Sequence, residues 1–583
     1  MARYTADFET CTWLPNETYV WAWAVAEIGN TDNIVIGNSI ETFFDFIFKN
    51  GGKYYFHNLK FDCEFILYHL LKNNYEYIAD KKDRRDKTFT TLISDMGVFY
   101  SLEIYYMHEG KLRSIKILDS LKIIPLSVDE LPKAFGLTIN KLKLDYDTPR
   151  EKGYELKDYE KDYITNDVKI VALCLEEMFK IDLTQMTIGS NALKNFKETK
   201  GIKTFSHLFP KLSRALYEDI KKCYRGGFTY LNPIYEEVDN EETYNLDVNS
   251  LYPSCMVDNP MPFGTPIFFE GKYQEDKVYP LYIQRLTCSF KIKKDHIPTI
   301  QIKNTLSYAD NEYLETTNGE VETLTLTSVD LKLFFEQYDV DNLKYICGWK
   351  FKSLRGIFDD YIYYWINVKN EATITGNKGL RQIAKLLLNS LYGKFATKMR
   401  VQNKIPYLED DIVKYQLSEE GEKDGIYIPI GCFITSYARD KTIRTSQAIK
   451  SYSINKYGKD MYIYSDTDSI KTLLPIEELE QFCDIDPIKL GAWKFEGKAI
   501  RSRFIRQKTY LEEFINDKGE RVVDITCAGM PKECYKYVEW EKFKVGFSCE
   551  GKLNFTHVKG GVKLVPEDFT IKGKKLIRNI KAF

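Results

Sequence analysis

Two aspartates, Asp466 and Asp468, lie two residues apart in "YIYSDTDSIKTL" (462–473), whose apolar and β-branched residues predict a buried hairpin. Carboxylates this close raise each other's pKa unless a cation lies between them. A third acid, Asp247, follows a predicted strand and precedes "VNSLYP". With the backbone carbonyl of Val248, the three acids would form a cage of hard oxygen ligands suited to Mg²⁺ carrying a triphosphate. The alternative is an Asp-rich surface turn, and the apolar flanks argue against it.

The segment 380–395, "LRQIAKLLLNSLYGKF", predicts a helix that ends at Gly393. One face would be apolar and would pack on the core. A second face would be basic and polar, because the spacings of four, four and three align Arg381, Lys385, Asn389 and Tyr392. This face suits a nucleotide, with cations on the phosphates and the tyrosine against the base. A solvated cationic face is the alternative, and it explains the tyrosine less well.

A second set of acids lies in the N-terminal third, in three short-range pairs that share faces of predicted elements. They are Asp7 with Glu9 on a strand, Asn58 with Asp62 at a helix start, and Tyr163 with Asp167 on a helix. Four acids brought together could hold two Mg²⁺ or Mn²⁺ ions about 3.5–4 Å apart for in-line attack of water on a phosphodiester. The tyrosine could orient that water. Each pair alone is commonplace, but their order within one α/β layer favours the functional interpretation.

The elements that must position these residues form more than one domain. The chain has 583 residues, so we expect two to four domains, and 44% hydrophobic with 28% charged residues is a globular balance. Residues 1–190 alternate strand-like and helical runs, including an amphipathic helix over 61–73, which indicates an α/β layer. Segment 257–360 is predicted to be a mixed insertion, and 396–430 a hairpin with an acidic tip.

Bulk charge does not indicate a nucleic-acid partner, because the net charge is −2. Two basic runs, 498–508 and 572–581, would more often be solvated surface if they stood alone. The longest apolar run, 19–28, is too short to span a membrane, and the N-terminus does not have the pattern of a signal peptide. Twelve dispersed cysteines without a C-x-x-C pair predict neither a zinc site nor a disulfide framework, which fits a reducing compartment.

Eight motifs occur along the chain in this order: "DFET", "HNLKFD", "YITND", "YRGG", "DVNSLYP", "KLLLNSLYG", "YSDTDS" and "KTY". In this order and over residues 4–572, the chain resembles the protein-primed family B DNA polymerases, most closely the small phage replicases of the phi29 type. The resemblance implies an α/β multidomain fold with an RNase H-like 3′–5′ exonuclease domain. A palm, fingers and thumb polymerase domain with two terminal-protein-region insertions would follow.

The ranges that the resemblance implies cover the whole chain. They are 1–190 for the exonuclease, 191–256 for the start of the palm with the YRGG hinge, 257–360 for the palm with the first insertion, 361–395 for the fingers, 396–430 for the second insertion, 431–530 for the palm with the DTDS and KTY motifs, and 531–583 for the thumb and basic tail.

For editing, the resemblance implies two groups of residues. The metal-binding acids would be Asp7, Glu9, Asp62 and Asp167, with Tyr163 assisting and Lys141 contacting the scissile phosphate. The residues that hold the frayed primer strand would be Thr10, His57, Asn58, Phe61, Ser120 and Leu121.

For synthesis, the resemblance implies that Asp247, Asp468 and the backbone of Val248 hold the catalytic metals, with Asp466 in support. The cofactor would be Mg²⁺ (or Mn²⁺), two ions per active site, and the primer 3′-hydroxyl would attack the α-phosphate in line. Tyr252 would reject a 2′-hydroxyl, and the other nucleotide-binding residues would be Lys369, Arg381, Lys385, Asn389 and Tyr392. The hinge motif would be Tyr224, Gly226 and Gly227. The primer terminus would be held by Lys508 and Tyr510, which would bring the basic run 498–508 beside DNA phosphate.

The implied partners are primer-template DNA, dNTPs, a terminal protein whose hydroxyl primes synthesis, and phage proteins that bind single- and double-stranded DNA. The two insertions would close a ring around DNA, which would give processivity and strand displacement. We expect a monomer without membrane association, in the cytoplasm of an infected bacterial host.

The sequence departs from the family's usual pattern in four places. Ser465 stands where cysteine is usual, Cys63 and Glu64 replace a small pair, "TITGNKG" precedes the nucleotide helix, and the tail 573–583 extends past the usual end. Two alternatives stay open. One is a family B polymerase that uses nucleic-acid primers, or a linear-plasmid replicase. The other is an exonuclease with an inactive polymerase half. A purely structural DNA-binding protein would leave both acid clusters unexplained beside anionic DNA.

Overall fold

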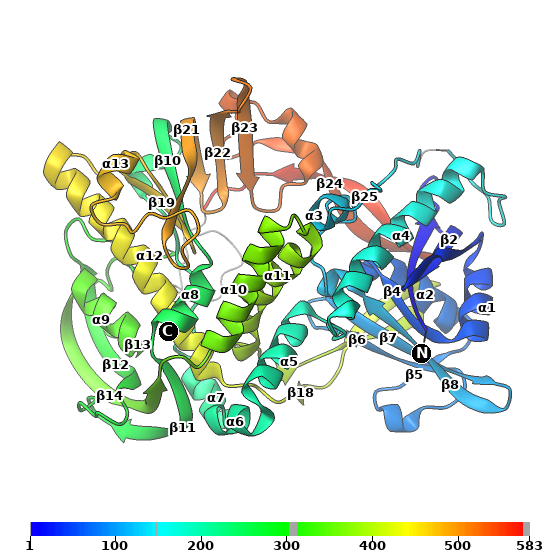
Figure 1. Cartoon of the computed structure of the whole chain (residues 1–583), viewed down its shortest axis with the longest axis horizontal. Coiled ribbons are helices and arrows are strands. Elements are labelled where there is room, and N and C mark those ends of the chain that lie inside the picture. The colour runs from blue at the N-terminus through cyan, green and yellow to red at the C-terminus, as the bar shows by residue number, and fades with distance from the viewer. Residues whose placement is uncertain (1, 147, 302–311, 575–583) are drawn as a thin grey trace.

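The computed structural model describes residues 2–146, 148–301 and 312–574, with the backbone alone at Lys552. Most of the tail 573–583 therefore lies outside the described residues. Two large bodies lie side by side, one formed by the N-terminal third and the other by most of the remaining chain, with a pair of long helices between them (Figure 1).

The N-terminal body is an eight-stranded sheet of order β3-β2-β1-β4-β8-β7-β6-β5, in which β1, β4 and β8 are parallel neighbours. Its strands are β1 Arg3–Thr10, β2 Val20–Glu27, β3 Asn30–Gly37, β4 Gly52–Phe56, β5 Glu76–Tyr77, β6 Thr88–Ile93, β7 Phe99–His108 and β8 Lys111–Asp119. The apolar run 19–28 is β2, which is buried on both faces: Trp23 and Val25 pack in one core, and Ala22 and Ala24 in another.

Helices cover both faces of this sheet. The cores assign α1 (Ile40–Asn50) and α2 (Leu59–Lys72) to one face and α4 (Asp158–Lys180) to the other. The prediction of an amphipathic helix over 61–73 is wrong in one respect: the helix α2 forms there, but it is buried on most of its circumference. Two hairpins from later in the chain, described below, contact the side of α2 that a lone amphipathic helix would expose to water.

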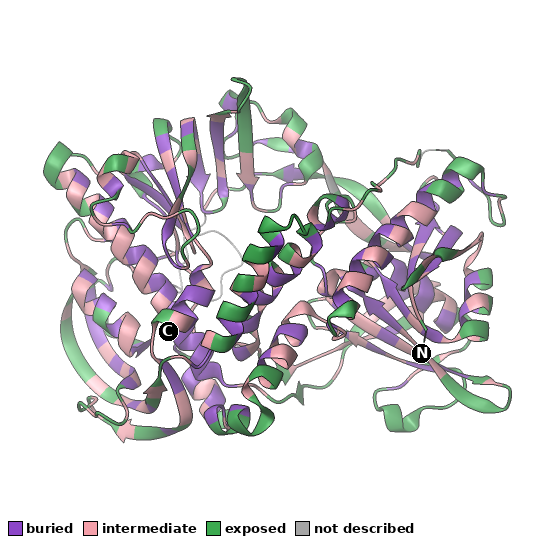
Figure 2. Ribbon diagram, in the orientation of Figure 1, coloured by how far each residue is buried: buried purple, intermediate pink, exposed green. Residues whose placement is uncertain are grey.

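The second body contains a seven-stranded antiparallel sheet of order β23-β22-β21-β10-β20-β19-β9. Its strands are β9 Thr229–Leu231, β10 Asp239–Val248, β19 Tyr462–Asp466, β20 Ser469–Thr472, β21 Trp493–Arg506, β22 Thr509–Ile515 and β23 Arg521–Cys527. The helices α8 (Leu251–Asp258) and α12 (Ile428–Tyr457) contact each other, and α12 packs on β19 and β20. The hairpin predicted at 462–473 is confirmed, and it lies inside the sheet. Figure 2 shows the outer strand β23 largely exposed.

The predicted insertion at 257–360 forms a four-stranded sheet of order β11-β14-β12-β13. Its elements are β11 Met261–Glu270, β12 Leu281–Ile292, β13 Glu322–Thr327, α9 Ser328–Gln337 and β14 Tyr338–Leu354. The long helix pair that follows is α10 (Asp359–Ile374) and α11 (Lys378–Phe395). The predicted end of α11 at Gly393 is wrong by two residues, because buried Phe395 packs against Phe209 and Phe358 and keeps the helix going.

Smaller elements complete the chain. They are α3 Leu131–Phe135, α5 Ile188–Lys200, α6 Ile202–Leu208, α7 Arg214–Lys221, α13 Ile476–Leu479 and the short pair β15 Arg400–Val401 with β18 Gly421–Glu422. The predicted hairpin within 396–430 is confirmed as β16 Lys404–Glu409 and β17 Ile412–Leu417, with Asp410 and Asp411 at its tip. A second hairpin, β24 Ser548–Val558 and β25 Gly561–Thr570, ends the described chain.

One cysteine pair departs from the expectation of no disulfides. Cys534 and Cys549 are joined, with Cα atoms 5.9 Å apart, and this bond ties the segment before β24 to that strand. The pairing depends on a loop return that their spacing does not reveal. Among the described residues, the other ten cysteines form no disulfide. Within the described ranges, no helix has the length and apolar character needed to cross a membrane.

A buried cation connects the insertion to the second body. Arg439 of α12 donates to both carboxylate oxygens of Asp330 on α9, at 3.1 and 2.7 Å. It also donates to the carbonyls of Arg225 and Gly226, at 2.8 and 2.7 Å. We expect Arg439→Met to lower the free energy of unfolding by about 3–5 kcal/mol, because it strands a buried carboxylate. The urea dependence of amide exchange in α12 measures this.

The matched control is Arg444→Met on the same helix, where the side chain is 40% exposed and its guanidinium pairs with Glu336 and Asp440. There we expect a loss of at most about 1 kcal/mol. Equal losses in the two variants would contradict the structural role of Arg439.

Candidate active sites

A cavity of about 660 Å³ opens at one edge of the N-terminal sheet. Most of the residues predicted for editing line it: Asp7, Glu9, Thr10, Asn58, Phe61, Lys141, Tyr163 and Asp167. The strand β1 supplies the first three and α4 the last two, so two of the three predicted shared faces are confirmed, Asp7 with Glu9 and Tyr163 with Asp167. In the third pair, Asn58 lines the cavity and Asp62 does not. Asp62 is buried on α2 behind Asp7, close enough for the two charges to interact.

Burial and mutual repulsion disfavour the charged forms of these acids. Burial first, and then the charge of Asp167, raises the pKa of Asp7 to about 7. Burial and the neighbouring acids also raise the pKa values of Glu9 and Asp62. The Lys141 ammonium lies 2.8 Å from an Asp167 oxygen and opposes this effect there, but burial still raises the pKa of Asp167.

The donor atoms fit a divalent cation. The Oδ1 atoms of Asp62 and Asp167 are buried without a hydrogen-bond partner, and hard oxygen ligands are what Mg²⁺ and Mn²⁺ prefer. Among the described residues, no three acidic, histidine or cysteine side chains already converge on one point. The carboxylates would therefore have to turn toward an ion, and Lys141 would have to release Asp167.

A tyrosine that the sequence did not reveal completes this cavity. The Tyr146 hydroxyl lies 2.8 Å from the Tyr163 hydroxyl, and the two rings meet edge to face. Tyr146 lies between α3 and α4 in a segment without helix or strand, where no periodicity marks it. The pair puts two hydroxyl groups beside the acids, where they could orient a water molecule.

Three residues predicted to hold the primer strand do not line the cavity. His57 contacts the Ser120 hydroxyl at 3.0 Å and the Leu126 carbonyl at 2.6 Å, and Ser120 donates to the Phe56 carbonyl at 2.9 Å. Leu121 directly follows Ser120 and donates its N–H to the Asp119 carboxylate. Asp119 also accepts a hydrogen bond from the N–H of Asn58, which lines the cavity, at 3.1 Å.

The hairpin β24–β25 forms the opposite wall of the cavity. Its contributing residues are Leu553, Phe555, Val562, Lys563 and Leu564. They are distant in sequence from the acids, and no local pattern could have revealed them.

The second acid cluster is held by backbone geometry. Asp247 lies near the end of β10, Asp466 ends β19, and Asp468 lies in the turn that follows. The Val248 N–H donates to the Asp468 carbonyl at 2.7 Å, which fixes the turn against β10. Thr467 has a φ of 60°, so the turn needs a left-handed residue.

The glycine pair of the YRGG motif approaches this turn closely. A Cβ atom on Gly227 would lie 2.5 Å from the Thr467 Oγ1 atom, which is closer than van der Waals contact allows. The Thr467 N–H donates to the Phe228 carbonyl at 2.6 Å. Glycine at 227 is therefore needed for the segment after Tyr224 to pack on the acid-bearing turn. Gly226 offers its carbonyl to Arg439.

The three acids of this cluster differ in their partners. The Lys508 ammonium contacts both oxygens of Asp466, at 2.8 and 2.6 Å, and the Thr229 hydroxyl donates to the same carboxylate at 3.0 Å. Burial, then the Asp468 charge, raises the pKa of Asp247 to about 7. Burial also raises the pKa of Asp468. In the described part of the chain, no side chain pairs with these two.

A cavity of about 480 Å³ joins Asp247 and Asp468 to α11. Every predicted nucleotide-binding residue lines it: Val248, Tyr252, Lys369, Arg381, Lys385, Asn389 and Tyr392. Burial and the charges of Arg381 and Lys385 lower the pKa of Lys369, as expected for three cations that lie close together. The rings of Tyr252 and Tyr392 stack at 4.0 Å.

The basic run 498–508 is mostly neutralised within the fold. Lys498 pairs with Glu242 at 2.9 Å, and Arg503 pairs with Asp239 at 2.7 Å. Arg501 lies 3.5 Å from Glu513 and stacks on Trp540. Lys508 alone in this run reaches the acid cluster, while Tyr510 packs beside it on Tyr464 and Phe504.

Comparison with known proteins shows the family of the chain. Residues 45–151 and 143–478 match the family described as DNA polymerase type B, organellar and viral. The chain belongs to this family. The polymerase is 41% identical to the DNA polymerase of Bacillus phage phi29 over 98% of this chain and 99% of that protein. It is 32% identical to the DNA polymerase of Streptococcus phage Cp-1 over 98% of both.

Solved structures agree with the sequence comparison. The phi29 DNA polymerase bound to primer-template DNA is 40% identical over 98% of this polymerase and 100% of that chain, with a TM-score of 0.90. The phi29 ternary complex with primer-template DNA and incoming nucleotides gives a TM-score of 0.89 at the same coverage. The predicted resemblance and fold class are confirmed.

The raised pKa values of the acids give a pH dependence with a definite sign. An acid whose folded pKa exceeds its unfolded value of about 4 binds more protons when folded, so its contribution to stability falls as pH rises toward 7. In metal-free protein we expect Asp7→Asn and Asp247→Asn each to raise the melting temperature more at pH 8 than at pH 5. Calorimetry with EDTA measures this.

Added Mg²⁺ should stabilise the wild type more at pH 8 than at pH 5, because binding requires deprotonated acids. For Asp7→Asn and Asp247→Asn, a larger rise in melting temperature at pH 5 than at pH 8 would contradict the assignment.

Proposed function

We propose that this polymerase replicates a linear phage genome that carries a terminal protein at its 5′ ends. It would be protein-primed, processive and strand-displacing, and it would edit with a 3′–5′ exonuclease. The observation that carries the synthetic half is one cavity that combines two unpaired acids, Asp247 and Asp468, with three cations and a stacked tyrosine pair. That set complements a nucleoside triphosphate with its metal ions.

In synthesis, Lys369, Arg381 and Lys385 bind the triphosphate of the incoming nucleotide. Tyr252 lies under the sugar and rejects a 2′-hydroxyl, and Tyr392 lies against the base. Asp247, Asp468 and the Val248 carbonyl hold Mg²⁺, two ions per site. Bound there, the ions supply charge neutralisation for the triphosphate and favour loss of the primer hydroxyl proton.

The remaining residues of this site position the DNA. Asp466 is held by Thr229 and anchors Lys508, whose free N–H groups can reach the primer-terminal phosphate. Tyr510 supports that lysine, and the hinge Tyr224, Gly226 and Gly227 connects the editing and synthetic halves. Asn389 lines the nucleotide cavity between Lys385 and Tyr392.

In editing, Asp7, Glu9, Asp62 and Asp167 hold two Mg²⁺ or Mn²⁺ ions. Tyr163 and Tyr146 orient the attacking water, and Lys141 contacts the scissile phosphate. The frayed strand lies along Thr10, Asn58 and Phe61, while His57, Ser120 and Leu121 support that wall. These roles are supported by the unpartnered carboxylate oxygens and by the strand-sized cavity.

The domain roles follow the same division. We assign editing to 1–190, the palm to 191–256 and 431–530, the two insertions to 257–360 and 396–430, the fingers to 361–395 and the thumb to 531–583. The partners would be primer-template DNA, dNTPs, the terminal protein and phage DNA-binding proteins. The polymerase would act as a monomer in the host cytoplasm.

The deciding experiment extends a labelled primer on a long single-stranded DNA circle with Mg²⁺ and dNTPs. We expect the wild type to make products longer than one circle. If the wild type only shortens the primer, the proposal fails and the chain is an exonuclease with an inactive polymerase half. A second reaction without nucleic-acid primer, with terminal protein supplied, should transfer labelled nucleotide to that protein. Failure there, with normal DNA-primed synthesis, would favour a family B polymerase that uses nucleic-acid primers.

Substitutions in the two acid clusters should separate the activities. We expect Asp247→Ala or Asp468→Ala to lower synthesis by about 10³-fold or more while exonuclease rates stay within about twofold. Asp7→Ala with Glu9→Ala should have the opposite effect. The measurement is nucleotide incorporation beside primer degradation, and retained synthesis in either single variant would refute the assignment.

The cations of the nucleotide cavity should affect substrate affinity. We expect Lys385→Ala to raise the KM for dNTP about 10- to 100-fold, because a charged hydrogen bond to phosphate contributes about 1.5–3 kcal/mol. Lys378→Ala at the exposed start of the same helix is the matched control and should change KM less than about twofold. Equal effects from both substitutions would contradict a specific phosphate contact.

A further inference from the structure

Glu64 of α2 is a buried carboxylate that neither acid cluster uses. Its side chain is 3% exposed, and it does not line the editing cavity. One oxygen accepts a hydrogen bond from the Tyr415 hydroxyl at 2.8 Å, and the other lies 3.2 Å from His557 Nε2. Tyr415 belongs to β17 and His557 to β24. A single carboxylate therefore contacts both hairpins that cover α2.

Further contacts converge on the same junction from the β16–β17 side. The Tyr415 ring meets the rings of Phe99 and His557 edge to face, at 6.2 and 6.0 Å. Lys72, near the end of α2, pairs with Asp411 at the hairpin tip. These contacts place the hairpin between the N-terminal sheet and β24.

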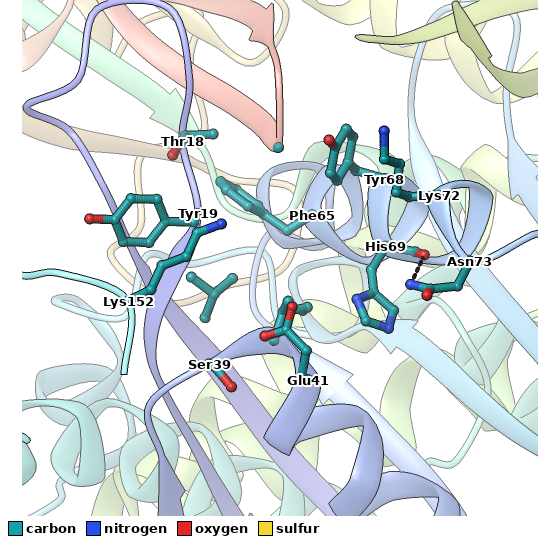
Figure 3. Close-up of a pocket in the computed structure, with 13 residues that line it drawn as sticks. Thr18, Tyr19, Ser39, Glu41, Phe65, Tyr68, His69, Lys72, Asn73 and Lys152 are labelled. Carbon is teal, nitrogen blue, oxygen red and sulfur yellow. Dashed lines mark hydrogen bonds between the residues drawn. The ribbon is translucent and has the colours of Figure 1, made fainter. Parts of the chain in front are cut away.

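The β24–β25 turn docks on α2 and on the segment before β2. The Thr18 N–H donates to the Lys559 carbonyl at 2.9 Å. A Cβ atom at Gly560 would lie 1.9 Å from the Thr18 carbonyl oxygen, and one at Gly561 would lie 2.6 Å from the Phe65 ring. Figure 3 shows Thr18 and Phe65 facing each other in a neighbouring cavity that Gly560 also lines. The close fit requires glycine at both positions of the turn.

Each hairpin is a separate two-stranded sheet, and such sheets are marginally stable without packing. Their positions therefore depend on where they dock. The Glu64 carboxylate is costly to bury unless its partners stay in place. Losing the β16–β17 hairpin would remove its hydrogen bond from Tyr415, and losing the β24–β25 hairpin would remove the imidazole of His557 that lies beside its other oxygen. The β24–β25 hairpin also forms one wall of the editing cavity.

We propose that Glu64 is a positioning residue that clasps the β16–β17 and β24–β25 hairpins to the exonuclease domain and so holds both against the DNA path during synthesis. This inference rests on the proposed function, and it assigns a role to a residue that departs from the family's usual pattern. Opening the clasp would release DNA between nucleotide additions without touching the nucleotide cavity.

The test compares wild type, Glu64→Ala, Glu64→Gln, Tyr415→Phe and the Glu64→Ala/Tyr415→Phe double variant. Primer extension with a competitor that traps dissociated enzyme measures product length per binding event. We expect Glu64→Ala to shorten products about fivefold or more. Losing a hydrogen bond to a charged group shifts the equilibrium between docked and undocked hairpins by that factor or more. Single-nucleotide insertion should stay within about twofold. The double variant should match Glu64→Ala, and Glu64→Gln should retain most of the product length because its amide still accepts from Tyr415.

The matched control is Glu160→Ala, which removes another buried carboxylate whose Arg150 partner lies in the same domain. It should lower thermal stability without shortening products below its melting temperature. Shortening as large as that of Glu64→Ala would overturn the proposal.

A readout without DNA keeps the clasp separate from the polymerase assignment. Amide exchange over 404–417 and 548–558 should be faster in Glu64→Ala than in the wild type. In Tyr415→Phe, exchange should be faster over 404–417. Tyr415→Phe is the milder variant and serves if the alanine protein does not fold. Unchanged exchange and unchanged product length would overturn the clasp. If the wild type makes no product at all, the proposed function fails, and the exchange result alone decides whether the clasp exists.

Discussion

Repulsion between partly buried carboxylates is the constraint on which both sites depend. In each cluster the backbone fixes the acids before any cation is bound. The elements β1 and α4 hold acids of the N-terminal cluster, and the end of β10 with the 466–468 turn holds the acids of the second cluster. One lysine then pairs with one acid, Lys141 with Asp167 in the first cluster and Lys508 with Asp466 in the second, although burial still raises the pKa of Asp167. The acids left over carry raised pKa values, and a divalent cation is the partner that resolves their repulsion.

The second cluster is connected to the rest of the polymerase by a short series of contacts. Asp330 on α9 binds Arg439, which binds the carbonyl of Gly226. The next residue, Gly227, packs on Thr467 between the two aspartates of the turn. The insertion, the hinge motif and the acid-bearing turn are therefore connected by direct contacts. We expect a change in any of them to alter the positions of the carboxylates.

Local patterns were sufficient to predict the acid-bearing hairpin, the basic face of α11 and two of the three N-terminal pairs, Asp7 with Glu9 and Tyr163 with Asp167, because each depends on spacing within one element. The family resemblance added the cavity residues that have no such spacing, such as Lys141 and Lys369. Contacts between distant segments could not be predicted from either source. Tyr146 beside Tyr163, the β24–β25 wall, the Cys534–Cys549 bond and the clasp at Glu64 are all of this kind. The ion pairs that neutralise the run 498–508 are also of this kind. Ser465, unusual for the family, is accommodated by hydrogen bonds with Tyr462 and Ser446.

The most direct test of the central claim is a crystal structure of the polymerase with Mn²⁺, a DNA primer-template ending in a dideoxynucleotide and the next dNTP, measured at the manganese absorption edge. We expect anomalous peaks between Asp247 and Asp468, and others among Asp7, Glu9, Asp62 and Asp167 with Lys141 moved off Asp167. Crystals that contain ordered dNTP but show no peak at Asp247 and Asp468 would contradict it.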